Sequence, residues 1–130
     1  MKNEPLEFHH IGVPTEKVMP VERYSSLYGM YTSDGQNEDI HIQFHRYNKD
    51  SILDKRIQNS VHIAFKTDNI EEYLKGKEVI MPMYEPFEGY KVAMVLLDDV
   101  PIEIIETTLS EEEIWNGDHS GSVLYRENKA

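Results

Sequence analysis

Residues 8–18 read FHHIGVPTEKV, and residues 60–70 read SVHIAFKTDNI. Aligned on His10 and His62, both stretches run histidine, isoleucine, a small residue, an apolar residue and, two positions later, threonine followed by an acidic residue. A repeat with a period of about fifty residues is typical of a chain built from similar supersecondary units that bury one shared core. The repeat therefore predicts two related halves, each of which opens with a strand that carries a histidine.

The composition is that of a folded acidic protein. Hydrophobic residues make up 39% of the 130 residues, which is enough for a core, and the length favours a single domain over residues 1–130. The formal net charge of −11 repels phosphate backbones, so nucleic acid is not expected as a partner. No apolar run approaches the length of a membrane span, and Met1–Pro5 lacks the apolar core of a signal peptide. The chain contains no cysteine, which favours a cytoplasmic location.

The first half combines strand and turn signals. Apolar alternation predicts strands over residues 6–13 and 40–47. Between them, a proline suited to a first helical turn and a closing glycine predict a helix over residues 20–29. The polar stretch 48–59 is interpreted as a linker to the second half.

The second half has the same order with more strands. Strands are predicted over residues 60–66, 77–81, 90–97 and 101–107, the last two as a hairpin. Helices are predicted from Asp68 or Asn69 to residue 74 and over residues 111–115, and the proline-rich stretch 81–90 is interpreted as a loop. The halves therefore read as two paired βαβββ-like modules, about residues 5–48 and 59–107, followed by a short helix and tail over 108–130. Because the first has room for only two strands after its helix, we expect an α+β fold with a shortened first module.

A second correspondence links the last strand of each half. In both strands one polar residue, Gln43 or Glu103, stands between two large apolar residues. Because side chains alternate along a strand, Gln43 and Glu103 point away from the face on which their apolar neighbours lie. An approximate two-fold relation between the halves would bring four side chains together: His10, Gln43, His62 and Glu103.

These four side chains form a plausible set of metal ligands. Two imidazoles, a carboxylate and an amide oxygen suit one divalent ion, such as zinc, nickel, cobalt, manganese or iron. Taken singly, each residue is more often an ordinary hydrogen-bonded strand residue. Their matching positions in a repeat favour metal binding instead. Four protein ligands leave two positions of an octahedral ion open for water or substrate.

Four segments carry a resemblance to a known family: FHHIGVPT, IHIQFHRY, SVHIAFKTDNIEEYL and KVAMVLLDDVPIEIIE. Over about residues 5–107 the chain resembles the vicinal oxygen chelate superfamily, which includes glyoxalase I, methylmalonyl-CoA epimerase, extradiol dioxygenases and bleomycin-resistance proteins. Within it, the chain is similar to short bacterial glyoxalase-like proteins. The resemblance implies modules whose sheets curve into a cup around a metal ion. It also implies that the ligand positions are His10, Gln43, His62 and Glu103, in the order seen in members similar to methylmalonyl-CoA epimerase.

The resemblance and the ligand set imply chemistry on a small oxygenated substrate. A divalent ion that polarises a carbonyl permits isomerase, epimerase or lyase chemistry through an enolate. Glu103 is the candidate catalytic base, and Glu38 is the only other glutamate near the site of the first module. Two alternatives stay open: an iron-dependent dioxygenase that uses His10, His62 and Glu103, and a non-catalytic small-molecule-binding protein of the same fold. Many relatives dimerise, so the resemblance also implies a homodimer.

Further side chains are candidates for the pocket or its cover. His41 and His45 share strand parity with Gln43, and are interpreted as substrate contacts, alternative ligands or partly exposed strand residues. His9 has the opposite parity to His10 and is expected beneath a helix. The remaining candidates are aromatic loop residues that could either form a lid or anchor the loop, and a tryptophan expected to cover one end of the core: Tyr84, Phe87, Tyr90 and Trp115.

Overall fold

Nine strands form one sheet in residues 6–116 and 126–127, the part of the chain that the structure, a computed structural model, describes. The order across the sheet is β6-β7-β8-β5-β1-β4-β3-β2-β9. The strands are β1 (Glu7–Pro14), β2 (Arg23–Ser25), β3 (Met30–Asp34), β4 (His41–Tyr47), β5 (His62–Lys66), β6 (Glu78–Phe87), β7 (Tyr90–Leu97), β8 (Val100–Thr107) and β9 (Arg126–Glu127). The helices are α1 (Lys55–Asn59), α2 (Ile70–Leu74) and α3 (Glu111–Asn116). None of the described helices is long and apolar enough to cross a membrane.

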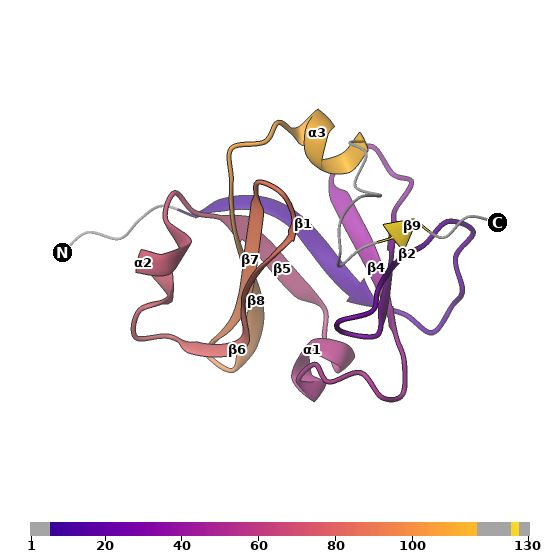
Figure 1. Ribbon diagram of the computed structural model, residues 1–130, viewed down its shortest axis with the longest axis horizontal. Coiled ribbons are helices and arrows are strands. Elements are labelled where there is room, and N and C mark those ends of the chain that lie inside the picture. The colour runs from indigo at the N-terminus through magenta and orange to yellow at the C-terminus, as the bar shows by residue number, and fades with distance from the viewer. Residues whose placement is uncertain (1–5, 117–125, 128–130) are drawn as a thin grey trace.

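The two halves of the repeat meet at the centre of the sheet, where β1 and β5 pair antiparallel. On either side of this pair, the first strand of each half pairs parallel with the last strand of the same half, β1 with β4 and β5 with β8. The sheet curves, and its two halves lie on opposite sides of Figure 1. This arrangement confirms the predicted α+β fold of two paired modules.

The second module follows the predicted order of strand, helix and three strands. Asn69 caps α2, because its side chain accepts a hydrogen bond from the backbone N–H of Glu72. Ile70 of α2 is fully buried in an apolar cluster with side chains of β7 and β8. The predicted hairpin is also present, and the two residues of its turn, Asp98 and Asp99, both have positive φ values (51° and 66°), as a tight hairpin turn requires.

The predicted helix over residues 20–29 is wrong. Ser25 and Gly29 do make the hydrogen bond of a single helical turn, from Gly29 N–H to the carbonyl of Ser25 at 2.8 Å. Gly29 then adopts a φ of 61°, which reverses the chain, so that β2 pairs antiparallel with β3. Three strands therefore follow β1 in this half, where the sequence predicted at most two. No described residue between β1 and β2 is helical, which explains why the first module is short.

The stretch 48–59 is not a plain linker, because it contains α1. The Asp54 side chain accepts a hydrogen bond from the backbone N–H of Arg56 and so begins the helix. Leu53 and Ile57 are both buried in the main core cluster. Their spacing of four residues places them on one side of the turn, so α1 is held in place by burial of these two side chains.

The interpretation of residues 81–90 as a loop is also wrong, because β6 continues through Pro82 and Pro86 to Phe87. Proline is tolerated here because β6 is the edge strand of the sheet and pairs only with β7. The pairing shifts register at three places along this strand, as expected where a strand accommodates irregular positions.

Candidate metal centre

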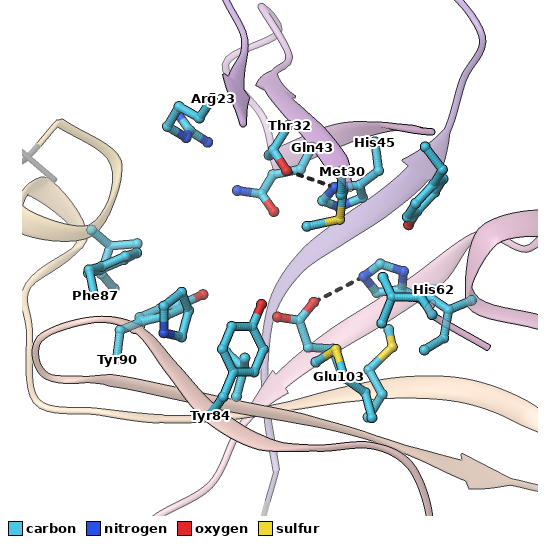
Figure 2. Close-up of a pocket in the computed structure, with 18 of the residues that line it drawn as sticks. Arg23, Met30, Thr32, Gln43, His45, His62, Tyr84, Phe87, Tyr90 and Glu103 are labelled. Atoms are coloured by element: carbon cyan, nitrogen blue, oxygen red, sulfur yellow. Dashed lines mark hydrogen bonds and ion pairs between the residues drawn. The ribbon is translucent and has the colours of Figure 1, made fainter. Parts of the chain in front are cut away.

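Three side chains from the two modules converge on the concave face of the sheet. They are His10 of β1, His62 of β5 and Glu103 of β8, and their ligand atoms all lie within 4.8 Å of one another. A hydrogen bond of 3.0 Å joins His62 Nε2 to Glu103 Oε1, and His10 Nε2 lies 3.4 Å from the same oxygen (Figure 2 shows the pair His62 and Glu103). Both imidazoles are buried, so these polar atoms face one another rather than bulk water.

The small residue in each copy of the repeat makes room for the histidine of the other copy. In the antiparallel β1–β5 pair, Gly12 lies opposite His62, and Ala64 lies opposite His10. A Cβ atom at Gly12 would collide with the imidazole ring of His62. The motif of histidine, isoleucine and a small residue therefore has a steric reason, which becomes visible only once the register of the two strands is known.

The same two small residues place Gln43 and Glu103 at equivalent positions. Gly12 pairs with Gln43 across the parallel β1–β4 ladder, and Ala64 pairs with Glu103 across the parallel β5–β8 ladder. Gln43 lines the same pocket as His62 and Glu103, and in Figure 2 its amide points into the cavity that the Glu103 carboxylate also faces. Gln43, His62 and Glu103 thus line one pocket, and His10 joins His62 and Glu103 in a tight group behind it.

Glu103 is held as a carboxylate. Its burial alone would raise its pKa, but the nearby His10 imidazole and the hydrogen bond with His62 lower the pKa of Glu103 well below its ordinary value. Burial has the opposite consequence for two other imidazoles: it lowers the pKa of His45 to about 3, with a further contribution from His62, and it lowers the pKa of His9 to about 4, with a contribution from His10. His9 and His45 are therefore neutral at pH 7.

The group formed by His10, His62 and Glu103 suits a divalent metal ion. His10 Nε2 is buried and makes no hydrogen bond within the described residues, although it faces the Glu103 carboxylate. A buried nitrogen without a partner is costly unless an ion or another polar group satisfies it. Two imidazoles and a carboxylate are ligands common to zinc, iron and related ions. These three side chains could therefore hold such an ion, with Gln43 on the opposite wall.

The pocket beside His62 and Glu103 is lined by both polar and apolar side chains and is partly open to solvent. The first module contributes polar side chains, among them Arg23, Thr32 and Gln43, and the second contributes methionine and aromatic side chains (Figure 2). The cavity suits a compound with a polar end and an apolar end.

The aromatic side chains predicted to form a loop lid lie instead on strands. Tyr84 and Phe87 belong to β6, and Tyr90 begins β7. All three line the pocket, and the rings of Phe87 and Tyr90 stack with centroids 4.7 Å apart. Because strands hold them, they form a fixed wall of the pocket rather than a mobile cover.

The other histidines divide between the pocket and the surface. His45 is buried in the pocket, where its Nδ1 hydrogen bonds with the Thr32 hydroxyl at 3.1 Å and its ring stacks on His62. His41 is exposed and stacks on Trp115 at 4.1 Å between ring centroids. His9 lies beneath α3, as predicted, with its ring stacked on Trp115. It does not face away from His10, however, because a register shift in β1 leaves the two Nδ1 atoms 2.8 Å apart. Trp115 packs against the main core cluster, as expected, and it also covers His9 and lines the pocket.

Two features of the site were missed or misplaced by sequence reasoning. Arg23 lines the pocket and makes two hydrogen bonds to the Asp34 carboxylate, at 3.0 and 3.1 Å. The sequence did not indicate Arg23 as a pocket residue, because the segment 20–29 was interpreted as a helix. The β2–β3 pairing shows that Arg23 reaches the cavity. Glu38, the candidate second glutamate, is exposed and is not among the residues that line the pocket.

Comparison with known proteins shows similarity in structure but not in sequence. No protein-family model and no curated protein matches the chain. Two solved variants of Streptomyces coelicolor methylmalonyl-CoA epimerase, each in complex with 2-nitronate-propionyl-CoA, superpose with TM-scores of 0.57 and 0.56. Each is 16% identical to this chain, and each match covers 81% of this chain and 100% of the epimerase.

A hypothetical protein from Staphylococcus aureus is a third structural match. It has a TM-score of 0.52 and 16% identity, and the match covers 85% of this chain and 61% of that protein. Identities this low show a shared fold and nothing finer. The matches therefore show that the chain shares the fold of these proteins.

Proposed function

We propose that the protein is a divalent-metal-dependent isomerase, epimerase or lyase that acts on a small oxygenated substrate through an enolate. The observation that carries this proposal is the group of His10, His62 and Glu103, which two modules assemble and of which His62 and Glu103 line a partly apolar pocket. These three residues and Gln43 are the proposed ligands. When bound, a divalent ion would polarise a substrate carbonyl and stabilise negative charge on its oxygen.

The side chains of the chain itself would position the substrate and move the proton. Among the described residues that line the pocket, Glu103 is the only one with a carboxylate, so we assign it the removal of the proton next to the carbonyl. The aromatic wall of Tyr84, Phe87 and Tyr90 would pack on the apolar part of the substrate and exclude water. Thr32 would keep the neutral His45 ring in place on the polar side.

The metal content of the purified, untagged protein tests the ligand set. We expect about one divalent ion per chain in the wild type, measured by mass spectrometry, and loss of most of it in Glu103→Ala and Gln43→Ala. Gln36→Ala and Glu78→Ala are matched controls, because both residues are exposed and lie outside the pocket, and they should retain the ion. A wild type that stays free of metal after reconstitution would argue instead for a non-catalytic binding protein.

Deuterium exchange tests the enolate chemistry. The metal-loaded protein should catalyse exchange of the proton next to the carbonyl in a panel of small oxo and hydroxy acids in heavy water, followed by NMR. Glu103→Gln should reduce this rate by about 10²- to 10⁴-fold, the range for loss of a general base. Oxygen consumption by the iron-loaded protein, without any proton exchange, would favour the dioxygenase alternative.

We also propose a homodimer. On the convex face of the sheet, α2 covers side chains of the second module, whereas several apolar side chains near the β1–β5 pair are exposed: Phe8, Val61 and Ile63. Exposed apolar side chains clustered on one face often mark a protein–protein contact. A cytoplasmic location is part of the same proposal and is supported by the absence of cysteine.

A further inference from the structure

A chain of contacts leads from the proposed metal ligand His10 away from the pocket to helix α3. His10 Nδ1 lies 2.8 Å from Nδ1 of His9, a hydrogen-bonding distance between two buried imidazoles. On the far side of the His9 ring, Nε2 is buried without a hydrogen bond and lies 3.3 Å from Oε1 of Glu111. Glu111 begins α3, which passes over β1 (Figure 1). The function proposed above does not use either His9 or Glu111.

The chemistry of these atoms allows two arrangements of hydrogen, and only one of them permits metal binding. A carboxylate can only accept, so Glu111 favours the form of His9 that carries its hydrogen on Nε2. The Nδ1 atom of a neutral His9 is then an acceptor, and the hydrogen between the rings must belong to His10 Nδ1. This leaves a free lone pair on His10 Nε2, the atom that faces Glu103. The reverse arrangement would place a hydrogen on that atom and block it as a ligand.

We infer that His9 and Glu111 are positioning residues, which select the tautomer of His10 that can bind a divalent ion through Nε2. The inference rests on the proposed metal-dependent function. Metal-binding histidines generally donate their second ring N–H to another group, and such partners set both the tautomer and the ring orientation. Here a second imidazole stands between the ligand and the carboxylate, so the orienting charge comes from a helix outside the sheet.

Trp115 holds this arrangement together. Its Nε1 donates a hydrogen bond of 2.8 Å to the same Glu111 oxygen that faces His9. Its ring stacks on the His9 ring, with centroids 5.4 Å apart and an angle of 14° between planes. Lys66 Nζ lies 4.0 Å from the other Glu111 oxygen. Although 52% of the Glu111 side chain is exposed, contacts with three different residues therefore fix its carboxylate.

Zinc affinity tests the role of Glu111. Isothermal titration calorimetry on the metal-free protein should show zinc binding at least about ten-fold weaker in Glu111→Gln than in the wild type. Glu113→Gln is the matched control, because it removes the same charge from the same helix while keeping an acceptor for the backbone N–H of Ser110. We expect Glu113→Gln to bind zinc like the wild type, which would separate a specific effect from a general loss of negative charge.

The tautomers provide a readout independent of affinity and of activity. In ¹⁵N NMR spectra of the zinc-loaded wild type, His10 should be protonated on Nδ1 and His9 on Nε2. Protonation of His9 on Nδ1, or equal zinc affinity of Glu111→Gln and the wild type, would overturn the inference while leaving the proposed function intact. If the wild type binds neither zinc nor nickel, cobalt, manganese or iron, the proposed function fails and this inference fails with it.

Discussion

At the scale of single residues, the site depends on the small side chains as much as on the histidines. Gly12 pairs with His62 on one side and with Gln43 on the other, so one glycine lies between proposed ligands from two strands. Ala64 has the equivalent place beside His10 and Glu103. The two histidines approach one another because the residue opposite each ring is too small to obstruct it.

Gly12→Ala should displace the His62 ring. The added Cβ would collide with the imidazole, so we expect a loss of about 1–3 kcal/mol in the free energy of unfolding, as for overpacked sites. The metal content should also fall, because His62 is a proposed ligand. Urea unfolding and mass spectrometry check both effects. Ala64→Gly is the control, because it removes volume at the equivalent position; full metal loading of Gly12→Ala would contradict the steric explanation.

At the scale of elements, the first module differs from the second in having no helix between its first two strands. Where the second module has α2, the first has residues 15–22 in irregular structure. Glu22 anchors this segment: its buried carboxylate accepts two hydrogen bonds from Arg46 of β4, at 2.8 and 3.1 Å, and one from the backbone N–H of Met19. Arg46 in turn lies over the ring of Tyr31, with Cζ 4.0 Å from the ring centroid.

This anchor should make stability depend on pH. The hydrogen bonds from Arg46 lower the pKa of Glu22 below its ordinary value of 4.5. A carboxylate whose pKa is lower in the folded state stabilises the fold fully above its unfolded pKa, and this contribution is lost as pH falls through the folded pKa. We therefore expect Glu22→Gln to lower the free energy of unfolding by about 1–3 kcal/mol at pH 7, and by much less at pH 3.

Urea unfolding of the wild type and of Glu22→Gln at both pH values provides the measurement. Glu72→Gln is a suitable control, since the pair that Glu72 forms with Lys75 is exposed on α2 and should contribute little at either pH. An equal loss of stability at pH 7 and pH 3 would mean that Glu22 acts through packing rather than through its charge.

The elements also show where local patterns misled. Tyr24 and Tyr28 have helical spacing, yet they lie on opposite faces: Tyr28 is in the core, whereas the Tyr24 ring packs against Tyr31. Local spacing fits either a helix or a turn of four residues. Here the antiparallel pairing of β2 with β3 selects the turn over the helix. This pairing is made by backbone hydrogen bonds, which the spacing of the side chains does not reveal.

At the scale of the whole molecule, the sheet is continuous across the two modules. The antiparallel pairing of β1 with β5 joins them, and the main core cluster includes residues of β3, α1, β6 and β7. Neither half buries its concave face alone. We therefore propose that residues 1–130 form a single domain.

A single domain should unfold in one transition. In differential scanning calorimetry of the metal-free protein, the calorimetric and van't Hoff enthalpies should agree. Adding zinc should raise the Tm of the wild type, because an ion that binds only the folded state stabilises it, and Glu103→Ala should show almost no rise. Two separate transitions would indicate that the modules fold independently and that the site depends on their docking.

The proposed homodimer also belongs to this scale. Ile63 is exposed on the central strand β5, and its replacement by a charged residue should disrupt a contact on the convex face. Light scattering after size exclusion should give a dimeric mass for the wild type and a monomeric mass for Ile63→Asp. Val18→Asp changes a more exposed apolar residue outside the sheet and should leave the mass unchanged. A monomeric wild type would refute the proposal.

The sequence alone determined what short-range pattern and internal repetition can express. The repeated histidine motif predicted two modules, strand parity predicted the faces of Gln43 and Glu103, and cap residues predicted α2 and its end. The tertiary structure decided what depends on distant partners: the β2–β3 hairpin, the course of β6 along an edge, and the place of Gly12 and Ala64 opposite the two histidines. It also brought Glu111 of α3 to His9, two residues 102 positions apart (111 minus 9). Such contacts depend on strand register and on how helices pack against the sheet. The energies that decide both arise between segments distant in sequence, so neither segment carries a periodic pattern that predicts the contact.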